Sequence, residues 1–387
     1  MKAASVPVQR PAHAKVLVVD DRGNIRHWAR SKFVDLLRPG DLIVANDAAV
    51  IPASLSGQHL PSGRTIEVRL AGRRSLAPDA VREFSVVVFG AGDFHTRTED
   101  RPLPPPLAVG DLLVLGPLRA VVTELLNHPR LVQLEFDGSP EEIWEGLARH
   151  GHPIQYSHVQ EPLALWDVWT PIAGPPVAFE PPSAGFALDW SVLDSMSARG
   201  VEFATITHAA GISSTGDPEL DALLPFDEPY RISELTALAI NKARAQEGRI
   251  IAIGTTVVRA LEDAAELDGS IRAGEGLATH RIGSTSQLRV VNAILSGTHE
   301  PGTGHYDLLR AFIDDTTLRH MDQELNEHAY RTHEFGDSVF IERQADASTQ
   351  EHAYRITWRL HWSERVRAGH GTVTCQADQL LVVAPKV

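Results

Sequence analysis

The sequence predicts an α/β protein in which a mixed or largely parallel sheet has flanking helices and carries a small inserted β-barrel. Two patterns and the length support this prediction. Strands and helices alternate in the second half of the chain, which is typical of parallel sheets, while short β segments follow one another between 57 and 136. The 387 residues also exceed the usual size of a single hydrophobic core.

The inserted barrel is predicted from β segments separated by turn residues. These segments lie at 65–70, 84–89, 111–115, 119–123 and 131–136. We therefore divide the chain into a main α/β domain of 1–56 and 137–345, an inserted β-barrel domain of 57–136, and a C-terminal β-rich extension of 346–387.

The main domain begins with a turn and a short apolar strand that ends at Asn46. A helix is predicted over 139–149, and a loop rich in proline and glycine follows from 151 to 185. Such long loops often bind ligands. The βα alternation then predicts helices at 189–199, 233–247, 255–267, 305–313 and 318–330, and strands at 202–207, 249–253 and 288–295. In such sheets, ligands bind at the carboxyl ends of the strands.

One segment, 249–262, carries the most functional information. An apolar strand is followed at once by Gly254, Thr255 and Thr256, and then by a helical pattern that places Arg259 and Glu262 on one face. The start of such a helix presents free N–H groups and the positive end of the helix dipole, which suits a carboxylate or phosphate. The threonines could cap the helix and bind the ligand, or they could cap the helix alone.

Composition limits the possible functions. The net charge is −14, which argues against tight nonspecific binding to nucleic acid, although a local patch could still bind it. The candidates for this patch are Arg64, Arg69, Arg73 and Arg74, which could equally form a solvated face. A single cysteine excludes an internal disulfide, and no run of residues is apolar enough to cross a bilayer. We expect a cytoplasmic monomer.

In their order along the chain, several motifs resemble one family, the S-adenosylmethionine:tRNA ribosyltransferase-isomerases of queuosine biosynthesis. The motifs are Pro39-Gly40-Asp41-Leu42 with Asn46, Val50-Ile51-Pro52-Ala53, Gly63 with Ile66-Glu67-Val68, Pro182-Ser183-Ala184-Gly185, Gly254-Thr255-Thr256-Val257-Val258-Arg259-Ala260-Leu261-Glu262, Val290-Val291-Asn292-Ala293, His299 with Pro301, Tyr330-Arg331 and Phe335-Gly336-Asp337-Ser338-Val339-Phe340-Ile341. The resemblance covers about 33–342.

This resemblance implies a transferase that moves the ribosyl part of S-adenosylmethionine to a 7-aminomethyl-7-deazaguanine base of tRNA and releases adenine and methionine. S-adenosylmethionine would be a co-substrate, with no permanently bound cofactor and no metal. The catalytic residues implied are Glu67, Glu262, His299 and Asp337. The residues implied for binding S-adenosylmethionine are Asn46, Ser183, Gly185, Gly254, Thr255, Thr256 and Arg259.

Each catalytic assignment has a structural alternative. Glu262 could only extend an amphipathic helix, Asp337 could be a turn residue, and His299 could be structural. The sequence also departs from the family at polar positions: Ala49 and Ser54 replace arginines, and Ala187 replaces a histidine. The chain could therefore act on a different acceptor, or it could bind a nucleoside or S-adenosylmethionine without catalysis.

Overall fold

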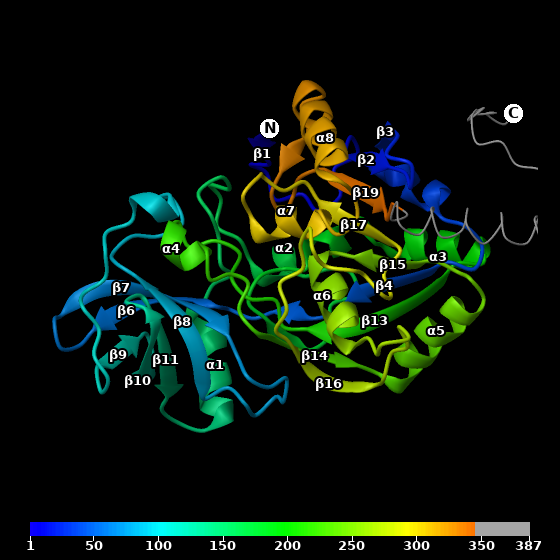
Figure 1. The fold of residues 1–387 in the computed structure, drawn as a ribbon. Coiled ribbons are helices and arrows are strands. Elements are labelled where there is room, and N and C mark those ends of the chain that lie inside the picture. The colour runs from blue at the N-terminus through cyan, green and yellow to red at the C-terminus, as the bar shows by residue number, and fades with distance from the viewer. Residues whose placement is uncertain (345–387) are drawn as a thin grey trace, which may run out of the picture. The chain divides into compact units, whose positions relative to one another are not determined.

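A computed structural model describes residues 1–344, and the predicted extension of 346–387 lies outside these described residues. A nine-stranded sheet dominates the described part of the chain (Figure 1). In spatial order its strands are β16 (Gly274–Ala278), β14 (Glu228–Ile232), β13 (Glu202–His208), β4 (Leu42–Asn46), β15 (Ile250–Ile253), β17 (Ala293–Gly297), β19 (Ser338–Glu342), β2 (Lys15–Val19) and β3 (Ile25–Ala29).

The four central strands β13, β4, β15 and β17 are mutually parallel, whereas β14, β16, β19 and β3 pair antiparallel with a neighbour. This arrangement confirms the predicted mixed or largely parallel sheet. Because side chains alternate along a strand, Leu42 and Val44 enter one core while Ile43 and Ala45 enter the other. Both faces of the sheet are thus apolar, as expected for a parallel sheet between two layers.

Helices cover both faces of this sheet (Figure 1). One core contains side chains from α5 (Glu234–Ala245), α6 (Thr255–Ala264), α7 (Gly304–Leu309) and α8 (Asp315–Glu327). The other core contains side chains from the 3-10 helices η1 (Arg30–Leu36) and η3 (Ser183–Ala187) and from α3 (Trp190–Ala198). The helices predicted from the βα pattern are therefore present, with ends that differ by a few residues.

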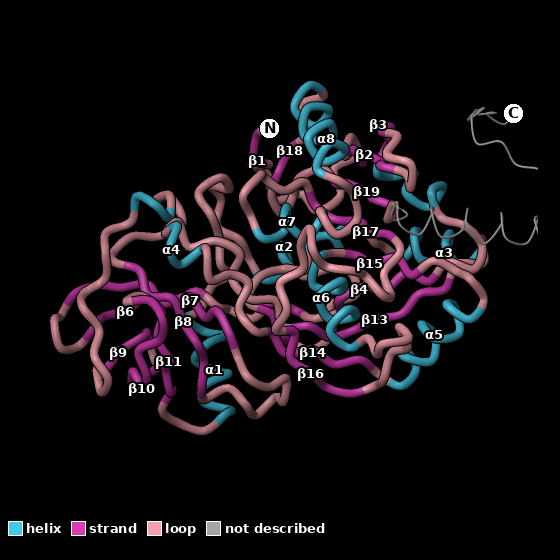
Figure 2. Tube along the Cα trace, in the orientation of Figure 1, coloured by secondary structure: helices cyan, strands magenta, loops and turns pink. Residues whose placement is uncertain are grey.

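The inserted β segments close into an antiparallel barrel, shown to the left of the sheet in Figure 2. Its strands are β6 (Ser54–His59), β7 (Arg64–Gly72), β8 (Glu83–Phe89), β9 (Leu112–Leu115), β10 (Leu118–His128) and β11 (Leu131–Phe136). β6 was not predicted from the sequence, and this strand places the start of the barrel at Ser54 instead of 57. The capping box of Ser139 and Glu142 then begins α1 (Pro140–His150), whose Ile143 and Leu147 extend the barrel core.

Shorter elements complete the described chain. They are β1 (Lys2–Ala3), β5 (Ala49–Val50), β12 (Pro176–Ala178), β18 (Arg331–Thr332), α2 (Leu165–Val168), α4 (Pro218–Asp221) and the 3-10 helix η2 (Thr98–Asp100). The segment predicted as a long loop over 151–185 therefore contains α2, β12 and the start of η3. Among the described helices, none is long and apolar enough to cross a membrane.

The strand predicted at 288–295 is displaced: β17 begins only at Ala293. The reason is a contact that no local pattern reveals, because the backbone N–H groups of Arg289, Val290 and Val291 all donate to the carboxylate of Glu262 on α6. Amides that are bound to a side chain cannot join the hydrogen-bond ladder of a sheet.

Candidate functional site

The predicted S-adenosylmethionine-binding residues gather at the carboxyl ends of the central strands. Gly254 follows β15 and is the N-cap of α6, with φ 95° and ψ 159°. Only glycine adopts this backbone region without strain, and a Cβ at this position would lie 3.4 Å from Cβ of Ala184 on η3. The turn therefore brings 183–185 against the start of α6. Neither threonine is the cap, which corrects the expectation that Thr255 or Thr256 caps the helix.

Asn46 joins the ends of β4 and β13. Its Oδ1 accepts from the backbone N–H groups of His208 (2.9 Å) and Ala48 (3.0 Å), and its Nδ2 donates to the carbonyl of His208 (2.9 Å). The same Nδ2 lies 3.5 Å from Oγ1 of Thr256. The contacts of Asn46 thus fix the backbone of His208 beside the N-terminus of α6.

The side chain of His208 is fully buried, and neither of its ring nitrogens has a hydrogen-bond partner. Its Nε2 lies 3.5 Å from Oε2 of Glu228. Burial, with the nearby guanidinium of Arg259, lowers the pKa of His208 to about 3, so the ring is neutral near pH 7. A buried polar ring without partners usually has its partner in a ligand or in water.

Arg259 and Glu228 form a buried ion pair beside His208. Nη1 of Arg259 donates to Oε2 of Glu228, and its Nη2 donates to the carbonyl oxygens of Ala278 (2.8 Å) and Phe226 (3.1 Å). Oε1 of Glu228 accepts from the backbone N–H of Gly211 at 2.6 Å. Most donors of Arg259 are therefore committed within the protein, and only its Nε lacks a partner.

A second carboxyl group, Glu180, lies just before the Pro182-Ser183-Ala184-Gly185 motif. The hydroxyl of Tyr156 donates to Oε1 of Glu180 at 2.5 Å, and the guanidinium of Arg69 lies 5.5 Å from the Tyr156 ring. Burial is the main cause that raises the pKa of Glu180 to about 7, and the charge of Glu334 adds to this effect. A carboxyl group with such a pKa exchanges protons near neutrality, as catalytic acids and bases do.

Histidines extend the site beyond β17. Nε2 of His299 lies 2.9 Å from Oγ of Ser296, and its ring centroid lies 4.8 Å from that of His305. Burial holds the pKa of His299 well below its usual range, with His305 and His333 as further causes, and it lowers the pKa of His305 to about 4. His299 is thus a neutral ring in the same region as Arg259, which also lowers the pKa of His305.

Glu67 lies on barrel strand β7 among cations. Its Oε1 accepts from Nε of Arg69 (2.7 Å) and from Oγ of Ser54 (2.8 Å), and its Oε2 accepts from Nη1 of Arg101 (2.5 Å). Although burial opposes ionisation, the charges and hydrogen bonds of Arg69 and Arg101 outweigh it and lower the pKa of Glu67. Glu67 is therefore an ionised group whose two oxygens are both bound.

Two further predicted catalytic carboxylates bind backbone amides. Glu262 holds the segment before β17, as described above. Asp337 accepts from the backbone N–H of Lys15 through Oδ1 (2.7 Å) and from that of Arg331 through Oδ2 (2.9 Å). Neither carboxylate belongs to the group formed by His208, Glu228 and Arg259.

The predicted basic patch needs correction. Arg69 and Arg73 are only 1% and 4% exposed, so they cannot form a surface patch with Arg64 and Arg74, which are exposed. Arg69 pairs with Glu67, and Arg73 donates to the carbonyl oxygens of Ser75, Ala77 and Ala80. Alternation along β7 places Val68 and Leu70 in the barrel core and Arg69 on the opposite face, where Tyr156 and other residues from outside the barrel cover it. A count of basic residues does not reveal this burial.

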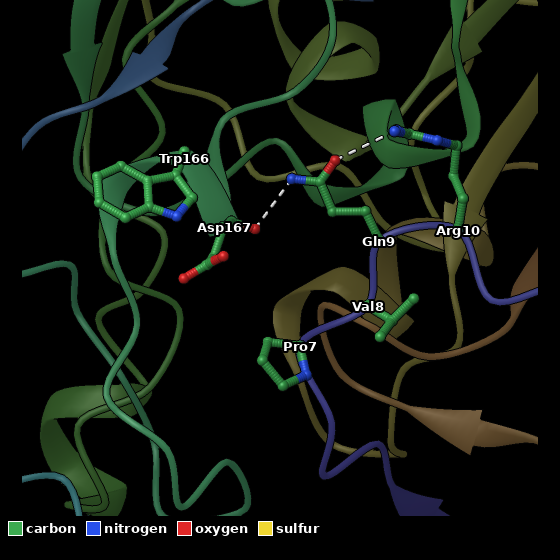
Figure 3. Close-up of a pocket in the computed structure, with 6 residues that line it drawn as sticks. All are labelled: Pro7, Val8, Gln9, Arg10, Trp166 and Asp167. Carbon is green, nitrogen blue, oxygen red and sulfur yellow. Dashed lines mark hydrogen bonds between the residues drawn. The ribbon is translucent and has the colours of Figure 1, made fainter.

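A separate surface recess lies between the N-terminal segment and α2 (Figure 3). It is lined by Pro7, Val8, Gln9, Arg10, Trp166 and Asp167. Nε2 of Gln9 donates to the carbonyl oxygens of Asp167 (2.9 Å) and Trp169 (2.8 Å), which joins the two walls. None of the residues predicted to bind or to react lines this recess.

Several polar residues of the site were missed from the sequence. They are Tyr156, Glu180, Glu228, His305 and Glu334. Glu180 was recognisable in part, because it stands immediately before a family motif. Glu228 and His305 carry no local signal, since only the packing of β14 and α7 against α6 brings them to Arg259.

The fold is that of an α/β protein with an inserted β-barrel, in which buried polar residues gather at the carboxyl ends of the parallel strands. A family model described as queuosine biosynthesis protein matches residues 1–341. The S-adenosylmethionine:tRNA ribosyltransferase-isomerase of Gloeobacter violaceus is 32% identical over 349 residues, 87% of this chain and 92% of that protein. The chain belongs to this queuosine biosynthesis family.

The chain is also similar to a second enzyme and to one solved structure. The enzyme of the same name from Geobacter sulfurreducens is 32% identical over 341 residues, which are 86% of this chain and 94% of that protein. A crystal structure of S-adenosylmethionine tRNA ribosyltransferase from Thermotoga maritima aligns with a TM-score of 0.46 at 21% identity, over 87% of this chain and 95% of that chain.

Proposed function

We propose that this protein transfers the ribosyl part of S-adenosylmethionine to the 7-aminomethyl-7-deazaguanine base of tRNA, with release of adenine and methionine. The observation that carries this proposal is the identity of 32% to an enzyme with that name over 87% of the chain. Two features at one end of the sheet support it. The N-terminus of α6 has no side-chain cap and suits an anion, and unpaired buried polar atoms lie near it. A tRNA substrate would place the reaction in the cytoplasm.

The first turn of α6 is the proposed site for the methionine carboxylate. Gly254 lets the backbone turn, and the first N–H groups of the helix have no side-chain cap. Thr256 is partly exposed and can add a hydroxyl, while Ser183 and Gly185 form the adjoining wall. A carboxylate at a helix N-terminus is stabilised by about 0.3–1 kcal/mol or more through the helix dipole, in addition to its hydrogen bonds.

His208 and Arg259 are proposed to form the nucleoside side of the site. The neutral ring of His208 can donate through one nitrogen and accept through the other, as an adenine or ribose edge requires. We propose that Arg259 acts mainly by holding Glu228 and the neighbouring carbonyl groups in place, because both of its terminal nitrogens are already bound.

Glu180 is our candidate for the group that accepts the proton from the 5′ carbon beside the sulfonium. Its pKa of about 7 allows a large ionised fraction at neutral pH while keeping it a better base than an ordinary carboxylate. Tyr156 orients it through the 2.5 Å hydrogen bond. His299, which is neutral, is proposed to assist the departure of adenine or the approach of the amine.

The remaining predicted catalytic carboxylates are proposed to position the site. Glu67 would hold Arg69 against Tyr156, and therefore indirectly against Glu180. Glu262 would fix the loop that leads to β17, and Asp337 would fix the strand that follows Tyr330. We further propose that Arg64 and Arg74, which stay exposed on the barrel, contact the tRNA backbone, and that the protein acts as a monomer.

The test is adenine release from S-adenosylmethionine by the full-length protein, with and without tRNA that carries the 7-aminomethyl-7-deazaguanine base. The proposal requires release that depends on this tRNA. Release that needs another amine would indicate a changed acceptor, as Ala49, Ser54 and Ala187 could allow. Binding of S-adenosylmethionine without any release would indicate a binding protein instead of an enzyme.

A further inference from the structure

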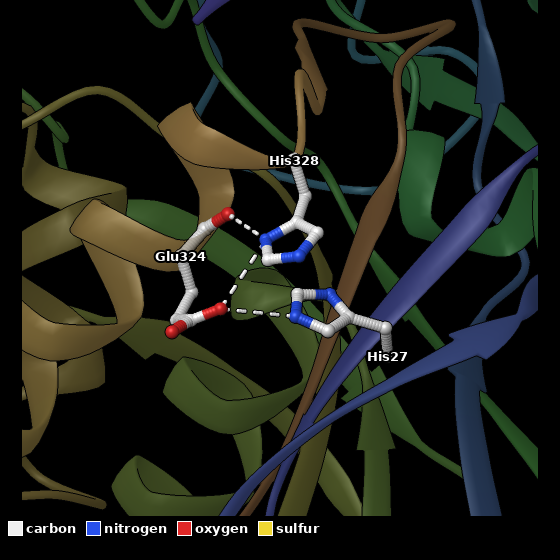
Figure 4. Close-up of side chains that lie close together, drawn as sticks. All are labelled: His27, Glu324 and His328. Atoms are coloured by element: carbon white, nitrogen blue, oxygen red, sulfur yellow. Dashed lines mark hydrogen bonds and ion pairs between the residues drawn. The ribbon is translucent and has the colours of Figure 1, made fainter.

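A cluster of histidines around one carboxylate lies at the outer edge of the sheet, on residues that the proposed reaction does not use. It joins His27 on edge strand β3 to Glu324 and His328 at the end of α8 (Figure 4). One ligand atom of each residue lies within 4.8 Å of those of the others. A fourth side chain, His320, stands one turn before Glu324, with its Nε2 at 3.4 Å from Oε1.

The distances in this cluster suit a transition-metal ion. Nε2 of His27 lies 3.1 Å from Oε2 of Glu324, and Nδ1 of His328 lies 3.2 Å from the same oxygen. Two ligands that each stand about 2.0–2.1 Å from a tetrahedral Zn²⁺ are separated by roughly 3.3–3.4 Å. Small side-chain movements would therefore bring the nitrogen and oxygen atoms to the separations that the ion requires.

The surroundings orient these ligands. Nδ1 of His27 lies 3.0 Å from the hydroxyl of Tyr330, which is buried, so the hydrogen bond directs Nε2 of His27 toward Glu324. His328 is the C-cap of α8, where the negative end of the helix dipole favours a cation. The ammonium of Lys15 nearby is bound to the carbonyl oxygens of His328 and Ala329, and it does not pair with Glu324.

The donor set of this cluster matches that of a transition-metal site. The rings of His27 and His328 have centroids only 3.9 Å apart, and one nitrogen of each ring lies beside the same carboxylate oxygen of Glu324. Nδ1 of His328 also lies 3.1 Å from the backbone carbonyl oxygen of Glu324, so a bound ion would take the place of the proton on this nitrogen. Imidazole nitrogens together with a carboxylate oxygen are ligands that Zn²⁺, Ni²⁺ and Co²⁺ bind.

We propose that His27, Glu324 and His328, with His320 as an additional ligand, bind one divalent transition-metal ion of the Zn²⁺ class. The ion would clamp α8 to the edge strand β3. Its role would be structural, since the ligands stand apart from the carboxyl ends of the central strands. The exposed edge of a sheet gains protection when a helix is fixed beside it.

The experiment is a calorimetric titration of Zn²⁺ into metal-depleted full-length protein, with Co²⁺ absorption as a spectroscopic readout of the ligand geometry. The wild-type protein is expected to bind one ion saturably at this site and to unfold at a higher temperature in its presence. The double variant His27→Ala, His328→Ala and the single variant Glu324→Gln should each weaken this binding at least about tenfold. These side chains are partly exposed, and adenine release reports whether the variants remain folded.

The matched control is His95→Ala, which removes a histidine paired with Asp93 on the exposed surface of the barrel region. It should leave Zn²⁺ binding unchanged. A second group, His158, His333 and Glu334, also meets the distance criterion within the described residues, so His158→Ala tests it separately. The proposal fails if the wild type shows no saturable binding, if the double variant binds like the wild type, or if only His158→Ala abolishes binding.

Discussion

Both ends of the central sheet carry buried polar side chains, but the two ends differ in how many of the polar atoms have a hydrogen-bond partner. Before β4 and β15, every side-chain nitrogen of Arg249 has a partner: Nε and Nη2 donate to Asp41, Nη1 donates to Glu342, and Nη2 also reaches the carbonyl of Leu36. After the same strands, both ring nitrogens of His208 and Nε of Arg259 have none. The fully paired ions around Arg249 stabilise the scaffold, whereas the unpaired atoms of the neutral His208 ring and of Arg259 leave hydrogen-bonding capacity for a ligand.

The largest loss of stability is expected when an ion pair of Arg249, before β4 and β15, is removed. Asp41→Ala leaves the mostly buried guanidinium of Arg249 without its main partner, which should cost about 3–5 kcal/mol in the free energy of unfolding. Urea denaturation measures this loss. Asp35→Ala, which removes an exposed pair with Arg199, is the control and should cost no more than about 1 kcal/mol. Similar losses in the two variants would contradict the distinction.

At the end with unpaired polar atoms, Glu180→Gln should reduce the turnover number for adenine release about 100-fold or more, because glutamine cannot accept the proton. In the wild type, turnover should rise with pH through about 7, where Glu180 ionises, and this rise should vanish in the variant. Steady-state rates between pH 5 and 9 test the prediction. A variant that kept the same rising limb would exclude Glu180 as the base.

The raised pKa of Glu180 also makes the free energy of unfolding depend on pH. The folded protein holds this proton more tightly than the unfolded chain, so the contribution of Glu180 to stability is complete below the ordinary glutamate pKa and is lost as pH rises through about 7. His208 behaves in the opposite way, because its contribution is present near neutral pH and is lost as pH falls from its ordinary value toward about 3. Denaturation of Glu180→Gln across this range should show a flatter dependence between pH 5 and 7.

Gly254→Ala tests the turn that connects β15 to α6. A φ of 95° with a ψ of 159° strains any residue with a Cβ, by about 1–3 kcal/mol. We expect that loss in urea denaturation together with a higher KM for S-adenosylmethionine, since the turn aims the first N–H groups of α6. Gly40→Ala, at a φ of 88° with open space around it, is the comparison: it should lose stability without a change in KM.

The smallest effect on stability is expected for a variant of His208. His208→Leu removes two unpaired buried nitrogens, so the free energy of unfolding should stay constant or increase. The kcat/KM for adenine release should nevertheless fall about tenfold, which corresponds to the loss of one hydrogen bond to the ligand. Loss of stability with unchanged kcat/KM would show that His208 serves the scaffold instead.

Local sequence patterns predicted the fold well where they carry a physical period. The apolar runs from Leu42 to Ala45 and from Ile250 to Ile253 were predicted as strands, and the structure shows their side chains alternating between the two cores. The segment after β15 was also predictable, because a glycine between an apolar strand and a helical pattern has few other uses. The site was less accessible to such reasoning. Glu228 and Glu180 look like ordinary acidic residues until their neighbours are known.

By itself, the sequence determined the α/β class, the inserted barrel, the family and the glycine turn before α6, since these depend on periodicity and on residues close together in the chain. Only the tertiary structure decided which partners each charged side chain has. Glu67 meets Arg101, Glu262 meets the amides of 289–291, and His27 meets Glu324 across many residues of chain. Burial and long-range pairing set the state of each ionisable group, and neither can be read from a residue's immediate neighbours.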